Sequence, residues 1–192
     1  EVKETVLEDR RIVELYLERS EEAILETDIK YGRYCHRIAF NILGNDEDSE
    51  ECVNDAYMRT WGSIPPNEPK SLSSFIGKIT RNLALDKLRS KKSDKRGCGE
   101  TPLALDELSE CVSGFDEISR REDSAEIREA LNGFLEGLNT VERSVFMLRY
   151  WMMEPIDSIA EMKGMSTSKV TTMLFRMRNK LKKHFMKEGI PL

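Results

Sequence analysis

Residues 155–183 (PIDSIAEMKGMSTSKVTTMLFRMRNKLKK) have the pattern of two helices joined by a tight turn. Pro155 suits the first position of a helix, where its missing N–H costs nothing. Gly164 tolerates the left-handed conformation that ends many helices. Ser166 or Thr167 then supplies a capping oxygen for the second helix. We therefore predict a helix-turn-helix in this part of the chain.

The second of these helices has two unlike faces. From Lys169 to Lys187 the sequence has seven Lys or Arg residues and no Asp or Glu, and hydroxyl side chains lie at the start of this helix, which favours entry into a DNA major groove. The alternative is a helical hairpin whose charges only solvate it. Phe175 argues against that alternative, because it lies off the apolar stripe and would suit a thymine methyl group. The apolar stripe consists of Val170, Met173, Leu174, Met177 and Leu181. The candidate DNA-binding residues are Ser166, Thr167, Ser168, Lys169, Thr171, Thr172, Phe175, Arg176, Arg178 and Lys180.

The composition is that of a helical, water-soluble protein. Hydrophobic residues make up 39% of the 192-residue chain and charged residues 34%, and no segment alternates with the period of a strand. No apolar run reaches the roughly 18 residues of a membrane-spanning helix, and the charged N-terminus is no signal peptide, so we expect a cytoplasmic protein without membrane insertion. The four cysteines lack metal-ligand spacing, which predicts no metal site. Cys35 and Cys52 lie inside helical patterns and are expected to be small core residues. Without a nucleophile set or phosphate loop, we expect neither an enzyme nor a cofactor.

The net charge of −5 hides two basic regions in an acidic chain. Residues 63–92 carry seven basic and two acidic side chains, and residues 126–192 carry eleven and eight. Residues 1–62 carry eight basic and sixteen acidic side chains instead. Two separate basic regions indicate two places where phosphates bind, and the acidic surface is left for another partner.

The order of helical patterns predicts an all-α protein with two small domains. Four helices are expected in the first domain, residues 1–92, with a proline-rich loop at 62–70 before the fourth. Ser20 can cap the second helix, which Gly44 ends, and Asn45 or Asp46 begins the third. Residues 93–124 have the composition of a flexible acidic linker. The helix-turn-helix lies in the second domain, residues 125–192.

Four stretches in this order resemble the extracytoplasmic-function (group four) sigma factors of bacterial RNA polymerase. They are ILGNDEDSEECVNDAYMRTW (42–61), FIGKITRNLALDKLR (75–89), LNTVERSVFMLRY (138–150) and STSKVTTMLFRMRNKL (166–181). The resemblance covers nearly the whole chain. It implies a protein that binds core polymerase, recognises the −35 and −10 promoter elements and helps to initiate transcription of a specific regulon.

The resemblance also implies roles for particular residues. The second domain would bind the −35 element and the polymerase flap, and the first domain the −10 element and the clamp helices; an anti-sigma factor is the expected regulator. Candidate −10 contacts are Lys70, Ser71, Ser74, Lys78, Arg81 and Asn82. Candidate polymerase contacts are Asp48, Glu51, Asn54, Asp55 and Trp61. The sequence departs from the family pattern at Ser49, Asn54, Phe75, Thr80, Thr171 and Met173, which bears on promoter preference and not on fold.

Two other functions compete with this reading. A stand-alone helix-turn-helix regulator would need no polymerase-binding surface on residues 46–61. A module that sequesters another regulator would not need the basic face of residues 168–183.

The linker contains a weak amphipathic segment that could restrain the protein. Nothing ahead of the first domain predicts a masking segment, so restraint is expected from a partner or from residues 101–118. In this hypothesis the apolar side chains dock on a domain while the acidic ones face basic residues; a tether that leaves the DNA surfaces open is the alternative. The apolar residues are Leu103, Leu105, Leu108 and Val112, and the acidic ones are Asp106, Glu107 and Glu110.

Overall fold

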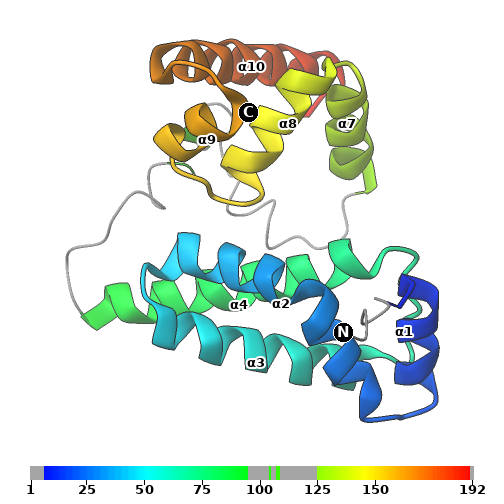
Figure 1. The fold of residues 1–192 in the computed structure, drawn as a ribbon. Coiled ribbons are helices and arrows are strands. Elements are labelled where there is room, and N and C mark those ends of the chain that lie inside the picture. The colour runs from blue at the N-terminus through cyan, green and yellow to red at the C-terminus, as the bar shows by residue number, and fades with distance from the viewer. Residues whose placement is uncertain (1–6, 95–103, 105–106, 109–124, 191–192) are drawn as a thin grey trace. The chain divides into compact units, whose positions relative to one another are not determined.

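The computed structural model describes residues 7–94, 104, 107–108 and 125–190, and every regular element within those ranges is a helix. The all-α prediction is therefore confirmed. The chain forms two compact units, Glu1–Gly97 and Cys98–Leu192, and each is described by itself (Figure 1).

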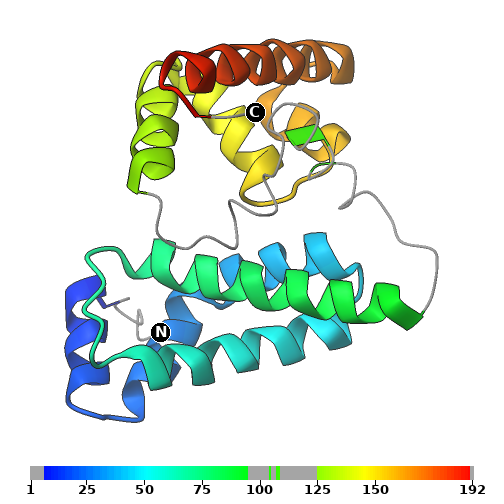
Figure 2. The ribbon, with the colours of Figure 1, turned by 180° about the vertical axis from the view of Figure 1, so that it is seen from behind.

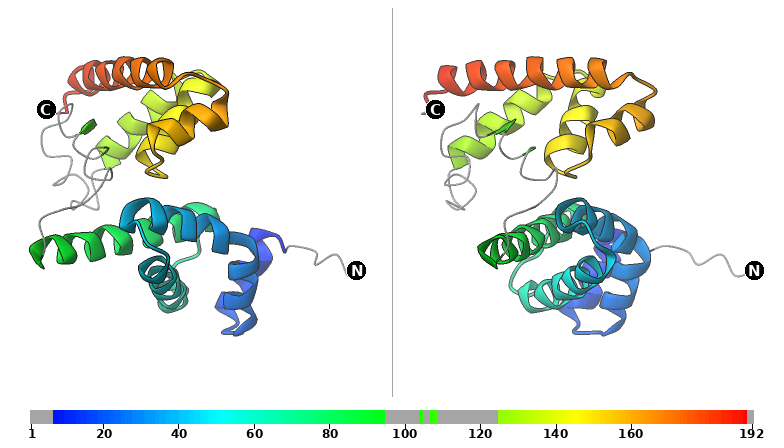
Figure 3. Two further views of the ribbon diagram at one scale, coloured as in Figure 1. Left: turned by 60° about the vertical axis from the view of Figure 1, so that its left-hand side comes forward. Right: turned by 90° about the vertical axis from the view of Figure 1, so that its left-hand side faces the viewer.

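The N-terminal unit contains four helices: α1 (Asp9–Leu17), α2 (Glu22–Leu43), α3 (Asp46–Ser63) and α4 (Leu72–Asp94). The long helices α2, α3 and α4 pack on one another, and α1 packs against α2 and α4. Figure 2 shows α3 and α4 from behind, and the right panel of Figure 3 views the three long helices close to end-on. Burying the facing sides of these helices gives the unit its own hydrophobic core.

Cys35 and Cys52 belong to this core, as their helical context predicted. Both side chains are buried, and burial raises the pKa of each thiol to about 11. Neither thiol is poised to react, since the thiolate is the reactive form. A buried hydrogen bond of 2.9 Å joins the hydroxyls of Tyr16 and Thr27 and ties α1 to α2.

The ends of α2 and α3 confirm one prediction and correct another. Gly44 ends α2 with a left-handed φ of 75°, and Asn45 begins α3 by accepting a 2.8 Å hydrogen bond from the Asp48 N–H. Ser20, in contrast, was expected to cap α2 and does not. Glu21 occupies the N-cap position in a helical conformation, so Ser20 contributes its backbone carbonyl, which accepts from the Ala23 N–H, and not its hydroxyl.

The C-terminal unit contains α7 (Ala125–Glu136), α8 (Thr140–Tyr150), α9 (Ile156–Lys163) and α10 (Thr167–Lys187). The long helix α10 lies across the other three (Figures 1 and 2). The cluster at their junction consists of Leu108, Ala130, Phe134, Leu138, Val145, Phe146, Tyr150, Ile159, Ala160, Val170, Leu174, Met177, Leu181, Phe185 and Ile190. Leu108 belongs to residues 93–124, for which the sequence predicted a linker, and its side chain is part of this core.

Asn139 gives a direct test of the cap that starts α8. Its Oδ1 accepts hydrogen bonds from the N–H groups of Val141 and Glu142, at 3.0 and 2.9 Å. We expect Asn139→Ala to lower the free energy of unfolding by about 1 kcal/mol, measured by denaturant unfolding followed by Trp151 fluorescence. The control is Asn132→Ala, an exposed position in α7. Equal stability of the two variants would contradict this role of Asn139.

Candidate nucleic-acid interface

The predicted helix-turn-helix is formed by α9 and α10. Pro155 is the N-cap residue of α9, one position earlier than expected. Gly164 ends α9 with a φ of 59°, and the Ser166 hydroxyl caps α10 by accepting from the Lys169 N–H at 3.3 Å. The turn between the helices thus depends on the one residue type that adopts this conformation without strain.

The apolar stripe predicted for α10 faces the core. Val170, Leu174, Met177 and Leu181 are buried, and Met173 is half-buried. Burial of this stripe fixes the rotation of α10 about its own axis, because all of its members lie on one side of the helix. The rotation determines which side chains remain outside.

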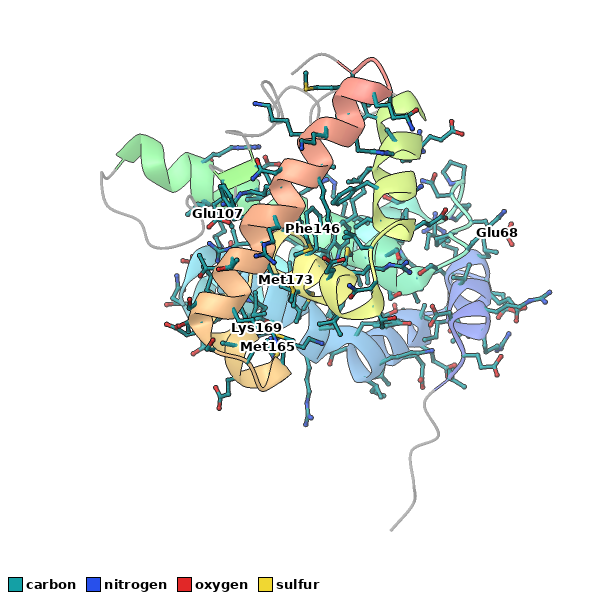
Figure 4. The ribbon with its side chains drawn as sticks, turned by 90° about the horizontal axis from the view of Figure 1, so that it is seen from above. Glu68, Glu107, Phe146, Met165, Lys169 and Met173 are labelled. Atoms are coloured by element: carbon teal, nitrogen blue, oxygen red, sulfur yellow. The ribbon has the colours of Figure 1, made fainter. Side chains whose placement is uncertain are left out.

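Most of the candidate DNA contacts on α10 are exposed. They surround a shallow depression of about 350 Å³ that is lined by Glu142, Ser166, Ser168, Lys169, Thr172, Met173 and Arg176. Phe175 is 57% exposed although it is aromatic, as expected of a side chain that contacts a partner and not the core. Figure 4 shows Met165 and Lys169 near the start of α10. Thr167 and Thr171 are exposed as well, and the Thr171 hydroxyl donates to the Thr167 carbonyl.

Two of the basic candidates on α10 have acidic partners within the protein. Lys180 lies 3.1 Å from Glu142 of α8 and remains mostly exposed. Arg178 lies 2.9 Å from the Glu107 carboxylate, and only 16% of its side chain is exposed. The ion pair of Lys180 is exposed, and such a pair is weak and exchanges readily. Arg178, in contrast, is held at the edge of the buried face of α10.

Glu107 joins three side chains of the C-terminal unit. Its Oε1 lies 2.8 Å from Nη2 of Arg149, and its Oε2 accepts from the Tyr150 hydroxyl at 3.0 Å and from Nη1 of Arg178 at 2.9 Å. Arg178 Nη1 also donates to the Tyr150 hydroxyl at 2.9 Å. Burial, the largest influence, raises the pKa of Tyr150, so this hydroxyl remains protonated as a donor. Figure 4 shows Glu107 beside α10.

Sequence reasoning gave no role to Arg149, which holds Glu107 next to the candidate interface. Its side chain is only 1% exposed, and besides Glu107 it contacts the carbonyl of Glu154 at 3.0 Å. The available signal was an arginine within the otherwise apolar stretch FMLRYW. A charge at such a place is tolerated only with a partner of opposite charge and with hydrogen bonds.

The linker hypothesis can be compared with the structure at two of its residues. Glu107 faces basic residues and Leu108 is buried in the core of the C-terminal unit, as the hypothesis predicted. The remaining residues named for it lie outside the described residues: Leu103, Leu105, Asp106, Glu110 and Val112.

Removing Arg149 tests the strength of this cluster. We expect Arg149→Ala to destabilise the C-terminal unit by about 3–5 kcal/mol, since it leaves the Glu107 carboxylate without its most buried partner. Denaturant unfolding followed by Trp151 fluorescence measures the change. The exposed Arg128 of α7 provides the control, Arg128→Ala, and similar unfolding midpoints for both variants would refute the assignment.

The candidate −10 residues form a polar border along the start of α4. Lys70, Ser71, Ser74, Lys78 and Asn82 are exposed. The Ser71 hydroxyl accepts from the Ser74 N–H at 3.3 Å and donates to the Ser74 hydroxyl at 3.0 Å, so the two hydroxyls are held together at the beginning of the helix.

Arg81 differs from its neighbours on α4 because it is largely enclosed. Burial, helped by the nearby Arg89 charge, lowers its pKa to about 10, and within the described residues its Nε is buried without a hydrogen-bond partner. An underused guanidinium at this place is suited to an anionic partner. Arg89 itself forms the expected helix-surface pair with Asp86 at 3.3 Å.

The candidate polymerase contacts divide into three groups. Asp48 and Glu51 of α3 form ion pairs with Lys87 of α4, the first at 3.3 Å. Asn54 and Asp55 are exposed on the same helix. The Trp61 ring packs 6.1 Å from that of Tyr16, with the Arg19 guanidinium 5.3 Å from its centroid. These contacts pack the Trp61 ring against its own unit.

A groove runs between α2 and α3 beside Asn54. It has a volume of about 600 Å³, and Leu25 and Met58 on its border are 60% and 62% exposed. The Tyr57 hydroxyl donates to Asp28 across its floor at 2.7 Å. The lining residues are Glu21, Ile24, Leu25, Asp28, Asn54, Tyr57, Met58 and Trp61. Exposed apolar side chains with acidic neighbours are typical of a protein-binding surface.

Metal and membrane sites find no support in the parts of the chain that the structure describes. No three His, Cys, Asp or Glu side chains there group closely enough to hold a metal ion. None of the helices in the described ranges combines the length and the apolar character needed to cross a membrane.

Each of the two units contains a region that matches a known protein family. Residues 29–93 match the model of sigma-70 region 2, and residues 128–181 match that of sigma-70 region 4. The chain is 26% identical over 165 residues to RNA polymerase sigma factor SigV of Bacillus subtilis (strain 168), which covers 85% of this chain and 90% of that protein. It is 29% identical over 56 residues to ECF RNA polymerase sigma factor SigE of Mycolicibacterium smegmatis (strain ATCC 700084 / mc(2)155), or 29% of this chain and 22% of that protein.

Proposed function

Because this chain belongs to the extracytoplasmic-function sigma factors, which bind core RNA polymerase and promoter DNA to initiate transcription, we propose that α10 reads the −35 promoter element. The observation that carries the proposal is the exposed face of α10. It presents hydroxyls at its start, Phe175 and Arg176 at its centre and basic side chains beyond them, opposite the apolar stripe that packs on the core. Sigma factors are initiation factors and not enzymes.

Geometry and chemistry divide the contacts of α10 into two kinds. Arg176 and Phe175 lie in the middle of the exposed face, where they would reach base edges in the major groove. Lys169 and Lys180 lie to one side and would contact phosphates. This division makes Arg176 the leading determinant of sequence preference.

The N-terminal unit would bind the −10 element through the start of α4. Lys70 and Lys78 supply positive charge, and Ser71, Ser74 and Asn82 supply hydrogen-bonding groups. The loop before α4 offers a rigid border against which an unpaired base of melted DNA could lie. Arg81 would donate hydrogen bonds from its guanidinium to a phosphate or base oxygen of the same strand.

The α2–α3 groove is proposed as the surface for the polymerase clamp helices. Leu25 and Met58 provide exposed apolar area, while Asn54 and Asp55 provide polar contacts beside it. Asp48 and Glu51 would contact the partner while paired with Lys87. The C-terminal unit would contact the flap.

An anti-sigma factor that covered this groove would exclude polymerase. One surface with exposed apolar side chains would then bind two competing partners, polymerase and the anti-sigma factor. The stand-alone regulator and the sequestering module are not favoured, because neither requires both sigma regions in one chain.

Arg176 and Lys180 should behave differently across a promoter library. We expect Arg176→Ala to cost about 1–3 kcal/mol of binding and to relax the preference at one base pair. Lys180→Ala should weaken binding to all sequences alike and reduce its salt dependence. Transcription by reconstituted polymerase from randomised −35 elements measures both.

Arg128→Ala is the control, because Arg128 is exposed on α7, away from the helix-turn-helix. If Arg176→Ala and Lys180→Ala changed the library in the same way, the division into base and phosphate contacts would be wrong.

Met58 tests the proposed clamp surface. We expect Met58→Glu to weaken binding to an isolated clamp-helix fragment of polymerase at least about tenfold, because it puts a charge into an apolar contact. Met186→Glu is matched in exposure, at 63% against 62%, and lies in the other unit. Titration calorimetry compares them, and an unchanged affinity of the Met58 variant would exclude this surface.

A further inference from the structure

Glu107 lies outside both regions that match a family model, which cover residues 29–93 and 128–181. It nevertheless makes contacts to α8 and α10 with both of its carboxylate oxygens. The next residue, Leu108, is only 3% exposed and belongs to the core of the C-terminal unit. A segment between the two sigma regions is thus anchored on the second of them.

The two arginines that hold Glu107 have different access to an external ligand. Arg149 is 1% exposed and is also bound to the Glu154 carbonyl, so no DNA phosphate can reach it. Arg178 is 16% exposed and lies on α10, three residues after Phe175. Residues at this spacing are neighbours on a helix surface, so Arg178 adjoins the side chains that would enter the groove.

We propose that Arg178 is a phosphate-binding residue of the DNA interface that Glu107 occupies in the free protein. A guanidinium donates to a carboxylate and to a phosphate with the same geometry, and one bound acceptor reduces its capacity for the other. DNA binding by α10 then requires Arg178 to exchange the Glu107 Oε2 atom for a phosphate oxygen. This inference rests on the proposed DNA-binding function of α10.

Glu107 and Leu108 remain attached to the C-terminal unit during this exchange. Oε1 of Glu107 keeps its contact with the buried Arg149, and Leu108 keeps its place in the core. The exchange breaks the contact of Oε2 with Arg178. The cost of exchange is therefore the loss of one partly exposed ion pair, which phosphate contacts can offset.

Glu107→Gln tests the proposal because glutamine keeps the shape and the acceptor oxygen but removes the charge. We expect the full-length variant to bind a labelled DNA duplex about three to ten times more tightly at low salt. The slope of log affinity against log salt should become steeper by up to about one. Fluorescence anisotropy measures both quantities.

Two further variants distinguish competition between Glu107 and DNA for Arg178 from a general effect of net charge on DNA affinity. Glu129→Gln makes the same change in net charge at an exposed site on α7 and should leave binding unchanged. In an Arg178→Gln background, Glu107→Gln should have no effect on affinity, since the competing site is absent; this is the coupling that a double-mutant cycle detects.

The outcomes are distinguishable. Tighter binding by Glu107→Gln that disappears in the Arg178→Gln background supports the proposal. Weaker binding, an effect that persists without Arg178, or an equal effect of Glu129→Gln overturns it. If Arg176→Ala weakens binding while Glu107→Gln does not strengthen it, this inference fails and the proposed function stands. If Arg176→Ala leaves binding unchanged, the proposed function fails and this inference fails with it.

A measurement on the wild-type protein covers the case in which Glu107→Gln does not fold. Because linkage is reciprocal, DNA that takes Arg178 must weaken the hold on Glu107. Amide hydrogen exchange in the peptide that contains residues 104–108 should become faster when duplex DNA is added. Unchanged or slower exchange would overturn the proposal.

Discussion

Burial of one side of α10 is the constraint on which the C-terminal unit depends. Val170, Leu174, Met177 and Leu181 meet α7, α8 and α9 at the centre of the unit. Because the helix is rigid, fixing this side also fixes the direction of the opposite one. The same packing that stabilises the unit therefore presents Phe175 and Arg176 to solvent, where no internal contact requires an aromatic ring.

The buried guanidinium of Arg149 adds a second requirement. A charge that is 1% exposed needs an anionic partner, and the Glu154 carbonyl, in the loop between α8 and α9, accepts one hydrogen bond from it but carries no charge. Glu107, more than forty residues earlier in the chain, supplies the carboxylate. The segment between the two sigma regions is thus part of the C-terminal unit at this point, and its position bears on the charge that α10 offers to DNA.

In the N-terminal unit, some charged residues hold the helices together and others face outward. Lys87 of α4 bridges to Asp48 and Glu51 of α3, so two of the residues assigned to polymerase contribute to internal packing in the free protein. Asn54 and Met58, one helical turn apart, remain outside beside the groove. Arg81 is the opposite case, a cation enclosed by the unit whose Nε is unused within the described residues.

The sequence by itself determined the helices, their ends at Gly44 and Gly164, the buried stripe of α10 and the family. These features depend on local spacing and on the conformational freedom of single residues. It did not determine that Ser20 contributes its backbone carbonyl, and not its hydroxyl, at the start of α2. The conformation of Glu21 there is set by how α1 meets α2. Nor did it place Arg149 against Glu107 or turn Arg178 toward the same carboxylate. Those pairings join residues that are 42 and 71 positions apart. Tertiary packing brings them within hydrogen-bonding distance: α8 meets α10, and Leu108, next to Glu107, is buried in the core that these helices form.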